Sequence, residues 1–177
     1  MAKKLPKIIN QEEFERLLKS IDKAKRISTK RKKEYKIAFL LGFEAGMRIS
    51  EIVGYKDKIP PLTPEMVDNA SIKILGKGGK ERIVPRPKRI NENAVKLLPL
   101  KIKRRALQLF ITKLGKEVLN KPITFHTLRH GFCSHLAGLG RPLHEVQMLA
   151  GHSRLDTTGI YLHANPKQAI AEARELF

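Results

Sequence analysis

Six side chains, distributed along the chain, could take part in one reaction. Arginine, lysine and histidine side chains bind anions and move protons, and a tyrosine hydroxyl can act as a nucleophile. Taken one at a time, each has an ordinary structural explanation, such as a surface ion pair or a solvated turn. The functional hypothesis therefore depends on their combination and order. The six side chains are Arg48, Lys77, His126, Arg129, His152 and Tyr161.

Two other chemistries are disfavoured by the same segments. His126 and His130 are four residues apart, a spacing that can bind zinc on a helix, but no Glu lies between them and Arg129 would place a positive charge beside the cation. The glycine-rich run at 76–80 contains Lys77 but lacks the spacing of a phosphate-binding P-loop. We therefore expect neither a metal site nor a nucleotide site.

In order and approximate spacing, the six side chains resemble the catalytic set of the tyrosine recombinase or phage integrase family, most closely its Xer branch. Arg129 precedes His152 by 23 residues, and His152 precedes Tyr161 by nine. The resemblance extends from about Lys36 to His163. The letters that carry it are GMRISE at 46–51, GKGGKERIVP at 76–85, HTLRH at 126–130, AGHS at 150–153 and TTGIY at 157–161.

The resemblance implies a role for each side chain. Tyr161 is the expected nucleophile, which attacks a DNA phosphodiester and forms a 3′-phosphotyrosine. Arg48 and Arg129 would grip the non-bridging oxygens, and Lys77 would protonate the departing 5′-oxygen. His126 and His152 would bind the phosphate or carry the proton of the nucleophile. Because the ester stores the energy of the broken bond, the reaction needs no ATP, metal or other cofactor.

Nearby residues are expected to support this set. Glu51, one helical turn from Arg48, is interpreted as a partner that orients an arginine. His130 is interpreted as a packed, hydrogen-bonding histidine beside the motif. Tyr35 and Tyr55 lack the surrounding pattern, so Tyr161 is the expected nucleophile.

The charge of the chain indicates a polyanionic partner. Lys and Arg number 36 against 17 Asp and Glu, for a net charge of +19. Heat adaptation would enrich Glu together with Lys, and here Glu has not followed. We expect double-stranded DNA, contacted mainly at phosphates. The candidate DNA-contact residues are Lys25, Arg26, Lys30, Arg31, Lys32, Lys80, Arg82, Arg86, Lys88, Arg89, Lys103, Arg104 and Arg105.

The elements that position these residues can be inferred from periodicity and caps. Asn10 and Glu13 resemble a capping pair, followed by apolar residues at helical spacing. The basic run at 23–33 is expected to be an exposed loop or helix end. Two Ile- and Val-rich runs around the glycine-rich turn predict a β-hairpin. Further helices are expected at 34–46, 48–54, 126–139 and 142–150, with helical patterning after Asn91 and a last helix beginning at Asn165-Pro166, and the hairpin strands at 71–75 and 81–85.

We therefore predict an α+β fold, mainly α-helical with a small antiparallel β-sheet, and a single catalytic domain over 1–177. Too few residues precede the Arg48 helix for the N-terminal DNA-clamping domain usual in the family. The tail at 166–177 has an amphipathic pattern. It is expected either to pack on its own domain or, as the resemblance implies, to dock onto a neighbour in a tetrameric synapse.

Alternative interpretations remain. A type IB topoisomerase uses closely similar chemistry, and a DNA-binding regulator could retain the fold without catalysis. A ribosome-associated basic protein would explain the charge alone. Cys133 stands alone, which excludes an intramolecular disulfide. No run of 18 apolar residues and no signal peptide is present, so we expect a cytoplasmic protein without membrane association.

Overall fold

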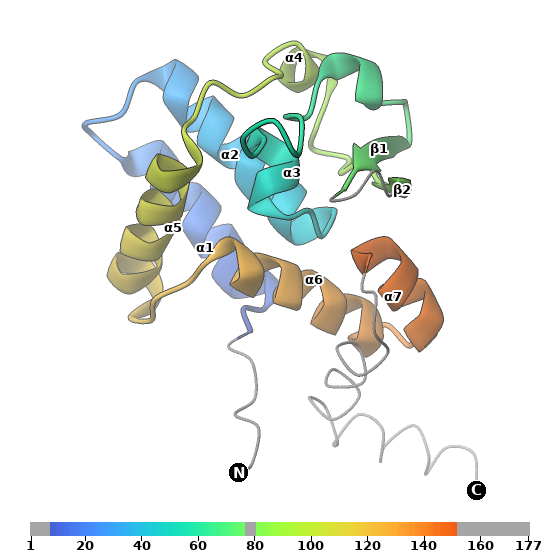
Figure 1. Cartoon of the computed structure of the whole chain (residues 1–177). Helices are drawn as coiled ribbons and strands as arrows, with labels where there is room; N and C mark the ends of the chain where they lie inside the picture. The colour runs from blue at the N-terminus through green and yellow to red at the C-terminus, as the bar shows by residue number, and fades with distance from the viewer. Residues whose placement is uncertain (1–7, 77–80, 152–177) are drawn as a thin grey trace, which may run out of the picture.

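The computed structural model describes residues 8–76 and 81–151. Its described part consists of helices and one two-stranded antiparallel sheet, which confirms the predicted fold class (Figure 1). No helix among these residues is long and apolar enough to cross a bilayer. The elements are α1 (Gln11–Lys23), α2 (Thr29–Glu44), α3 (Ile49–Val53), the 3-10 turn η1 (Pro64–Met66), β1 (Ser71–Leu75), β2 (Glu81–Pro85), α4 (Glu92–Val95), α5 (Arg104–Leu119), α6 (Phe125–Gly138) and α7 (Leu143–Ala150).

The first helix begins where its cap was predicted. The side chain of Asn10 accepts a hydrogen bond from the Glu13 backbone N–H at 2.8 Å, and the Glu13 carboxylate accepts one from the Asn10 N–H at 3.2 Å. This reciprocal box satisfies two N–H groups that have no partner within the helix.

The second helix begins earlier than predicted, at Thr29 rather than Glu34. Ser28 caps it by accepting from the Arg31 N–H at 3.3 Å. Lys and Arg have good helix propensity, so the end of the basic run extends the helix by a turn. Only the residues from Ala24 to Ser28 form the loop.

The core surrounds α2, whose residues 37–43 are all buried. The helix packs against α1 and α6, with Phe14 stacked on Phe43 at 4.1 Å and Phe39 edge-on to Phe125 at 5.8 Å between ring centroids. Because this interior is dense and aromatic, it fixes the ends of α2 and α6 relative to each other.

A smaller apolar cluster joins α7 to α6. Phe132 and Cys133 of α6 pack with Val146 and Ala150 of α7, and Cys133 is fully buried. The other side of α7 contacts β2, so α7 lies between α6 and the hairpin (Figure 1). This position brings the C-terminal end of α7 next to the start of α3.

Candidate active site

Arg48 lies at the junction between α2 and α3, where it is the residue that precedes the first turn of α3. Its backbone N–H donates to Glu51 Oε2 at 2.7 Å, and its Nη1 donates to Glu51 Oε1 at 2.9 Å. The Glu51 side chain is only 1% exposed, whereas the Arg48 side chain is 36% exposed. Glu51 therefore contacts the arginine that the sequence predicted it would orient, and Arg48 keeps an open side.

A second arginine, Arg82 of β2, binds the same carboxylate. Its Nη1 and Nη2 donate to the two oxygens of Glu51 at 2.6 and 2.8 Å, in the planar bidentate geometry that arginine forms with a carboxylate. Its Nε donates to the carbonyl of Leu149 at 3.2 Å. Arg82 thereby links the hairpin, α3 and α7.

The third arginine, Arg129, comes from α6 and is 4% exposed. Its Nη1 donates to the Gly46 carbonyl at 2.7 Å, and its Nη2 donates to the carbonyl of Ala150. Arg48 Nη2 donates to the next carbonyl, that of Gly151, at 3.0 Å.

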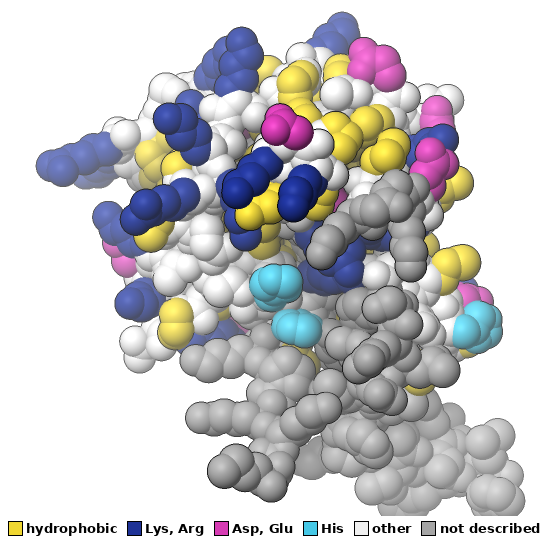
Figure 2. All heavy atoms as spheres, in the orientation of Figure 1, with side chains coloured by type: hydrophobic (Ala, Val, Ile, Leu, Met, Phe, Trp, Pro, Cys, Tyr) yellow, Lys and Arg dark blue, Asp and Glu magenta, His cyan; other side chains and the backbone are white. Residues whose placement is uncertain are grey.

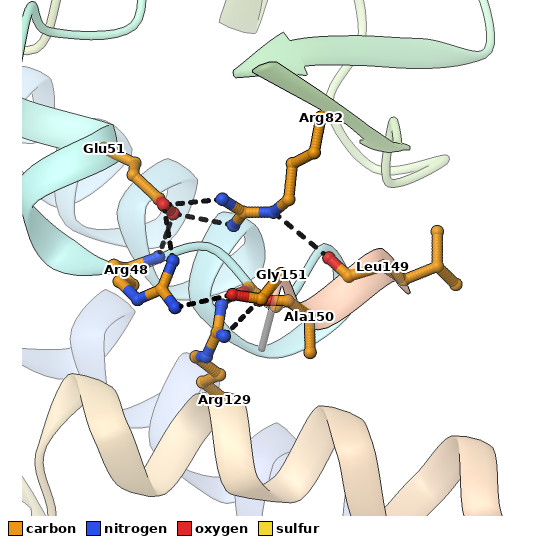
Figure 3. Close-up of polar contacts among 8 residues, drawn as sticks. Arg48, Glu51, Arg82, Arg129, Leu149, Ala150 and Gly151 are labelled. Carbon is orange, nitrogen blue, oxygen red and sulfur yellow. Dashed lines mark hydrogen bonds and ion pairs between the residues drawn. The ribbon is translucent and has the colours of Figure 1, made fainter. Parts of the chain in front are cut away.

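Three consecutive carbonyls at the end of α7 are thus each bound by an arginine from a different element (Figure 3). A helix C-terminus carries partial negative charge on carbonyls that lack a partner within the helix, so positive side chains are favourable there. Gly151 ends the helix in the left-handed conformation, with φ 62°. His152 follows it directly in the sequence.

The charges of this cluster do not balance. Three guanidinium groups surround one carboxylate, and within the described ranges no second carboxylate pairs with them. Burial, followed by repulsion from Arg48 and Arg82, lowers the pKa of Arg129 to about 10, so Arg129 remains charged at neutral pH. Burial raises the pKa of Glu51, but hydrogen bonds and charge from Arg82 and Arg48 outweigh it and hold that pKa below the usual value. The cluster therefore carries an excess of positive charge that suits an anion.

His126 lies at the mouth of this cluster. A small hollow is lined by Arg48, Ile49, Ser50, Arg104, Phe125, His126 and Arg129. Burial lowers the pKa of His126, and the charges of Arg129, Arg48 and Arg104 lower it further. His126 is therefore mainly neutral at pH 7 and able to accept a proton or a hydrogen bond.

His130 lies one turn further along α6 and is half-buried. Burial, then the charges of His126 and Arg129, lower its pKa. Among the described residues, no group of three His, Cys, Asp or Glu side chains is arranged to hold a metal ion.

The structure brings Arg48, Glu51, His126 and Arg129 together, although they are distant in sequence. The remaining predicted site residues lie outside the described residues. They are Lys77, Lys80, His152, Tyr161 and the tail at 166–177.

Arg82 was assigned by sequence to the DNA-contact group, and its place in the cluster was missed. The alternation of inward-facing and outward-facing residues along the two strands indicates the position of Arg82. Ile72 and Val84 form a cross-strand pair and are buried, and Arg82 lies two residues from Val84 on the same strand, opposite the buried Ile74. Side chains two residues apart share a face of a strand, so an arginine at this position points toward the interior.

Arg86 is also less available than the sequence suggested. Its side chain is 9% exposed, and its guanidinium donates to the carbonyls of Ile90 and Asp68 and to Glu92. Arg31 and Arg89 are more exposed but pair with Glu34 and with Glu15 and Glu44. These contacts hold the fold together and leave fewer donors for another partner.

Other basic residues are exposed, and one of them, Arg104, lies at the site. Lys103, Arg104 and Arg105 begin α5, and Arg104 lies 4.9 Å from the Tyr55 ring centroid as well as lining the hollow with His126. Lys25, Arg26, Lys30 and Lys88 are exposed and Lys32 half-exposed. Figure 2 shows Lys and Arg side chains over the upper part of one face, with histidine side chains near its middle.

Comparisons with known proteins identify the relatives of this chain. Residues 99–168 match the phage integrase family. The tyrosine recombinase XerD of Listeria innocua is 32% identical, over 92% of this chain and 59% of the relative, so the chain spans about three-fifths of the length of this relative. A XerH site-specific recombinase, in a post-cleavage complex with a palindromic difH substrate, is 27% identical with a TM-score of 0.70, over 96% of this chain and 53% of that one.

The catalytic domain of bacteriophage HP1 integrase has the same fold, with a TM-score of 0.63 and 20% identity over 94% of this chain and 93% of that one. The matches to XerD and XerH extend over nearly the whole chain. The chain is similar to the tyrosine recombinases of the phage integrase family and has the fold of their catalytic domain.

Proposed function

We propose that this chain is the catalytic part of a site-specific recombinase that cuts and rejoins duplex DNA through a covalent bond to Tyr161. The observation that carries the proposal is the positively charged cluster of Arg48, Arg82 and Arg129 around Glu51, at the point where α7 leads into His152. A phosphodiester carries one negative charge, and more charge develops on its oxygens during attack by a nucleophile. A preorganised, partly buried excess of positive charge stabilises that development.

In the proposed reaction, the Tyr161 oxygen attacks phosphorus and forms a new P–O bond while the bond from phosphorus to the 5′-oxygen breaks. Arg48 and Arg129 bind the non-bridging oxygens. The carbonyls of Gly46 and Ala150 engage two of the five N–H groups of Arg129, so other N–H groups of the same guanidinium can donate to the phosphate. Rejoining reverses the step, when a 5′-hydroxyl attacks the phosphotyrosine and releases Tyr161.

Protons must move in both directions. Lys77 is proposed to give a proton to the departing 5′-oxygen, and His126 or His152 to receive the proton of Tyr161. The lowered pKa of His126 supports this role, because a neutral imidazole at pH 7 has a lone pair free to accept. Once phosphate is bound, its charge offsets the arginines and makes protonation of the histidine more favourable.

Double-stranded DNA is the proposed partner, held mainly by phosphate contacts. Lys103, Arg104 and Arg105 support this, since they are exposed and Arg104 lines the same hollow as His126. We propose that 1–177 is one catalytic domain, which corresponds to about three-fifths of the length of its relative. Self-association on DNA through 166–177, and a cytoplasmic location, complete the proposal.

Suicide duplexes test the proposed chemistry directly. Each duplex is nicked so that a short fragment is lost after cleavage, which traps the covalent adduct. The chain is incubated in EDTA with duplexes derived from recombination sites of Xer-type relatives, and the products are separated on a denaturing gel. We expect an adduct from the wild-type chain and none from Tyr161→Phe, with peptide mapping to Tyr161.

Three other outcomes would each contradict the proposal in a different way. An adduct that persists in Tyr161→Phe would identify a different nucleophile. DNA binding without an adduct, in both proteins, would contradict catalysis by this chain and favour a DNA-binding regulator. Relaxation of supercoiled DNA without sequence preference would instead favour a type IB topoisomerase.

A further inference from the structure

Arg82 contacts Glu51, Leu149 and Gly151, yet it does not line the hollow. Its guanidinium is bound by both oxygens of Glu51 at 2.6 and 2.8 Å and by the Leu149 carbonyl at 3.2 Å. The side chain is 11% exposed. With three of its five N–H groups engaged and little of its surface open, Arg82 is poorly placed to contact a phosphate itself.

The effect of Arg82 is therefore transmitted through Glu51. The same two carboxylate oxygens accept from Arg48, one from its side chain at 2.9 Å and the other from its backbone at 2.7 Å. A carboxylate held by a planar fork cannot rotate without breaking two charge-assisted hydrogen bonds. Glu51 thus stays in the orientation in which it holds the Arg48 guanidinium toward the hollow.

Arg82 also connects this pair to α7. Gly151 packs directly on it, since a Cβ built at Gly151 would lie 2.8 Å from Arg82 Cδ. The Leu149 carbonyl that Arg82 binds is followed by the carbonyls that Arg129 and Arg48 bind. Movement of Arg82 would therefore disturb both the carboxylate behind Arg48 and the end of α7.

We propose that Arg82 is a positioning residue for the strand-cleavage reaction. It holds Glu51, and through Glu51 it fixes the guanidinium of Arg48 against the non-bridging oxygens of the scissile phosphate. This inference rests on the proposed function. Its consequence is that loss of Arg82 weakens transition-state binding of phosphate charge, although Arg82 does not touch the phosphate.

The test measures cleavage under single-turnover conditions on two duplexes that differ at one substituent of the scissile phosphate. One has a normal scissile phosphate, and the other has a methylphosphonate there, in which a methyl group replaces one non-bridging oxygen and removes the negative charge. The proteins are the wild-type chain, Arg82→Gln and Arg82→Lys. Mutation of residues that orient the ligands of a metal typically lowers affinity or activity by about 10- to 100-fold, and we take the same scale for a residue that orients an arginine.

We expect Arg82→Gln to slow cleavage of the normal duplex by about 10- to 100-fold. The methylphosphonate has less charge to neutralise, so the ratio of the wild-type rate to the Arg82→Gln rate should fall toward about 1. This is expected for at least one of the two diastereomers, the one in which the methyl group replaces the oxygen that Arg48 binds. Arg82→Lys should behave like Arg82→Gln, because an ammonium keeps the charge but cannot form the fork. The ratio of the two rates comes from one protein preparation, so a partly unfolded sample lowers both rates and leaves the ratio unchanged.

Arg16→Gln is the matched control. Arg16 donates to the Val118 carbonyl at 2.8 Å, near the end of α5, so it makes the same kind of contact away from the site. We expect its ratio of rates to equal that of the wild type. If the wild type cleaves DNA, two results would overturn the inference. The Arg82 variants could slow cleavage of both duplexes by the same factor, or they could cleave both at the wild-type rate. Absence of cleavage by the wild type would instead overturn the proposed function on which it rests.

Discussion

Glu51 illustrates how one buried side chain organises the candidate site. It is nearly inaccessible, with 1% side-chain exposure, and it accepts from Arg48 and Arg82 with both oxygens. Burial of a carboxylate is costly unless charge and hydrogen bonds compensate it. Here two arginines do so, and the carboxylate in turn reduces the repulsion between guanidinium groups that lie close together.

Replacement of Glu51 tests this balance. In Glu51→Gln the shape is retained but three positive charges face no negative one, so we expect the free energy of unfolding at pH 7 to fall by about 3 kcal/mol. Urea unfolding followed by circular dichroism measures it. The carboxylate of the Lys73–Glu81 pair provides the control, because its side chain is 52% exposed and Glu81→Gln should change stability by less than about 1 kcal/mol.

The effect of Glu51→Gln on the free energy of unfolding should also depend on pH. The folded pKa of Glu51 is below its ordinary value of 4.5, so the folded chain binds this proton less readily than the unfolded chain. The stabilisation is therefore fully present above pH 4.5 and is lost as the pH falls through the folded pKa. The difference between wild type and Glu51→Gln should shrink in strongly acidic buffer, and a difference that stays constant from pH 7 to pH 3 would contradict the role of the charge.

Among the elements, α7 depends on its C-terminal glycine. Gly151 has φ 62°, and a Cβ there would lie 2.8 Å from Arg82 Cδ and 3.0 Å from Arg82 Nε. Arg82 cannot easily move aside, since both ends of its guanidinium are bound. The close approach of α7 to β2 therefore requires a residue without a side chain.

Gly151→Ala should lower the free energy of unfolding by about 1 to 2 kcal/mol for the left-handed backbone and also reduce cleavage, because it displaces Arg82. Thermal melts and the suicide-duplex assay measure the two effects. Gly140→Ala is the matched control, because Gly140 has φ 70° but nothing lies within 4 Å of a Cβ there. It should share the loss of stability and keep full cleavage, whereas equal loss of cleavage in both variants would rule out the clash.

The sequence predicted these elements better than their mutual contacts. The strands at 71–75 and 81–85, the cap at Asn10 and the short helix after Arg48 follow local rules of period, turn and cap chemistry, so they were predictable. The start of α2 was misplaced, because a basic run fits both an exposed loop and a helical first turn. Arg82 was missed for a different reason. Its partners lie 31 and 67 residues away, and only the packing of α7 on β2 brings them together.

At the scale of the whole molecule, the basic residues behind the net charge of +19 have two different roles. Arginines such as Arg86 and Arg89 are engaged within the protein, whereas Lys103, Arg104 and Arg105 at the start of α5 are exposed and Arg104 lines the hollow. Composition alone predicted a polyanionic partner, but it could not separate basic residues that stabilise the fold from those available to a ligand.

Reversal of one charge tests this distinction. Arg104→Glu should weaken binding to duplex DNA and reduce the slope of log affinity against log salt by about 1, since one phosphate contact and its released counterion are lost. Fluorescence anisotropy over a salt series measures both quantities. Lys113→Glu makes the same charge change on an exposed turn of the same helix, beside Glu117. A salt slope equally reduced by both variants would indicate a general effect of net charge and contradict a specific contact at Arg104.

The anchoring of α7 also limits how far the nucleophile can travel. Three arginines bind the carbonyls of Leu149, Ala150 and Gly151, so the position of Gly151 is fixed relative to the site. Ten residues connect Gly151 to Tyr161, and a fully extended chain spans at most about 3.6 Å per residue, or roughly 36 Å in all. Any phosphate attacked by Tyr161, in the same subunit or a neighbour, must lie inside a sphere of about this radius plus one tyrosine side chain. An assembly of this protein on DNA can therefore be judged by a single measured length, from Gly151 to the phosphate that is cut.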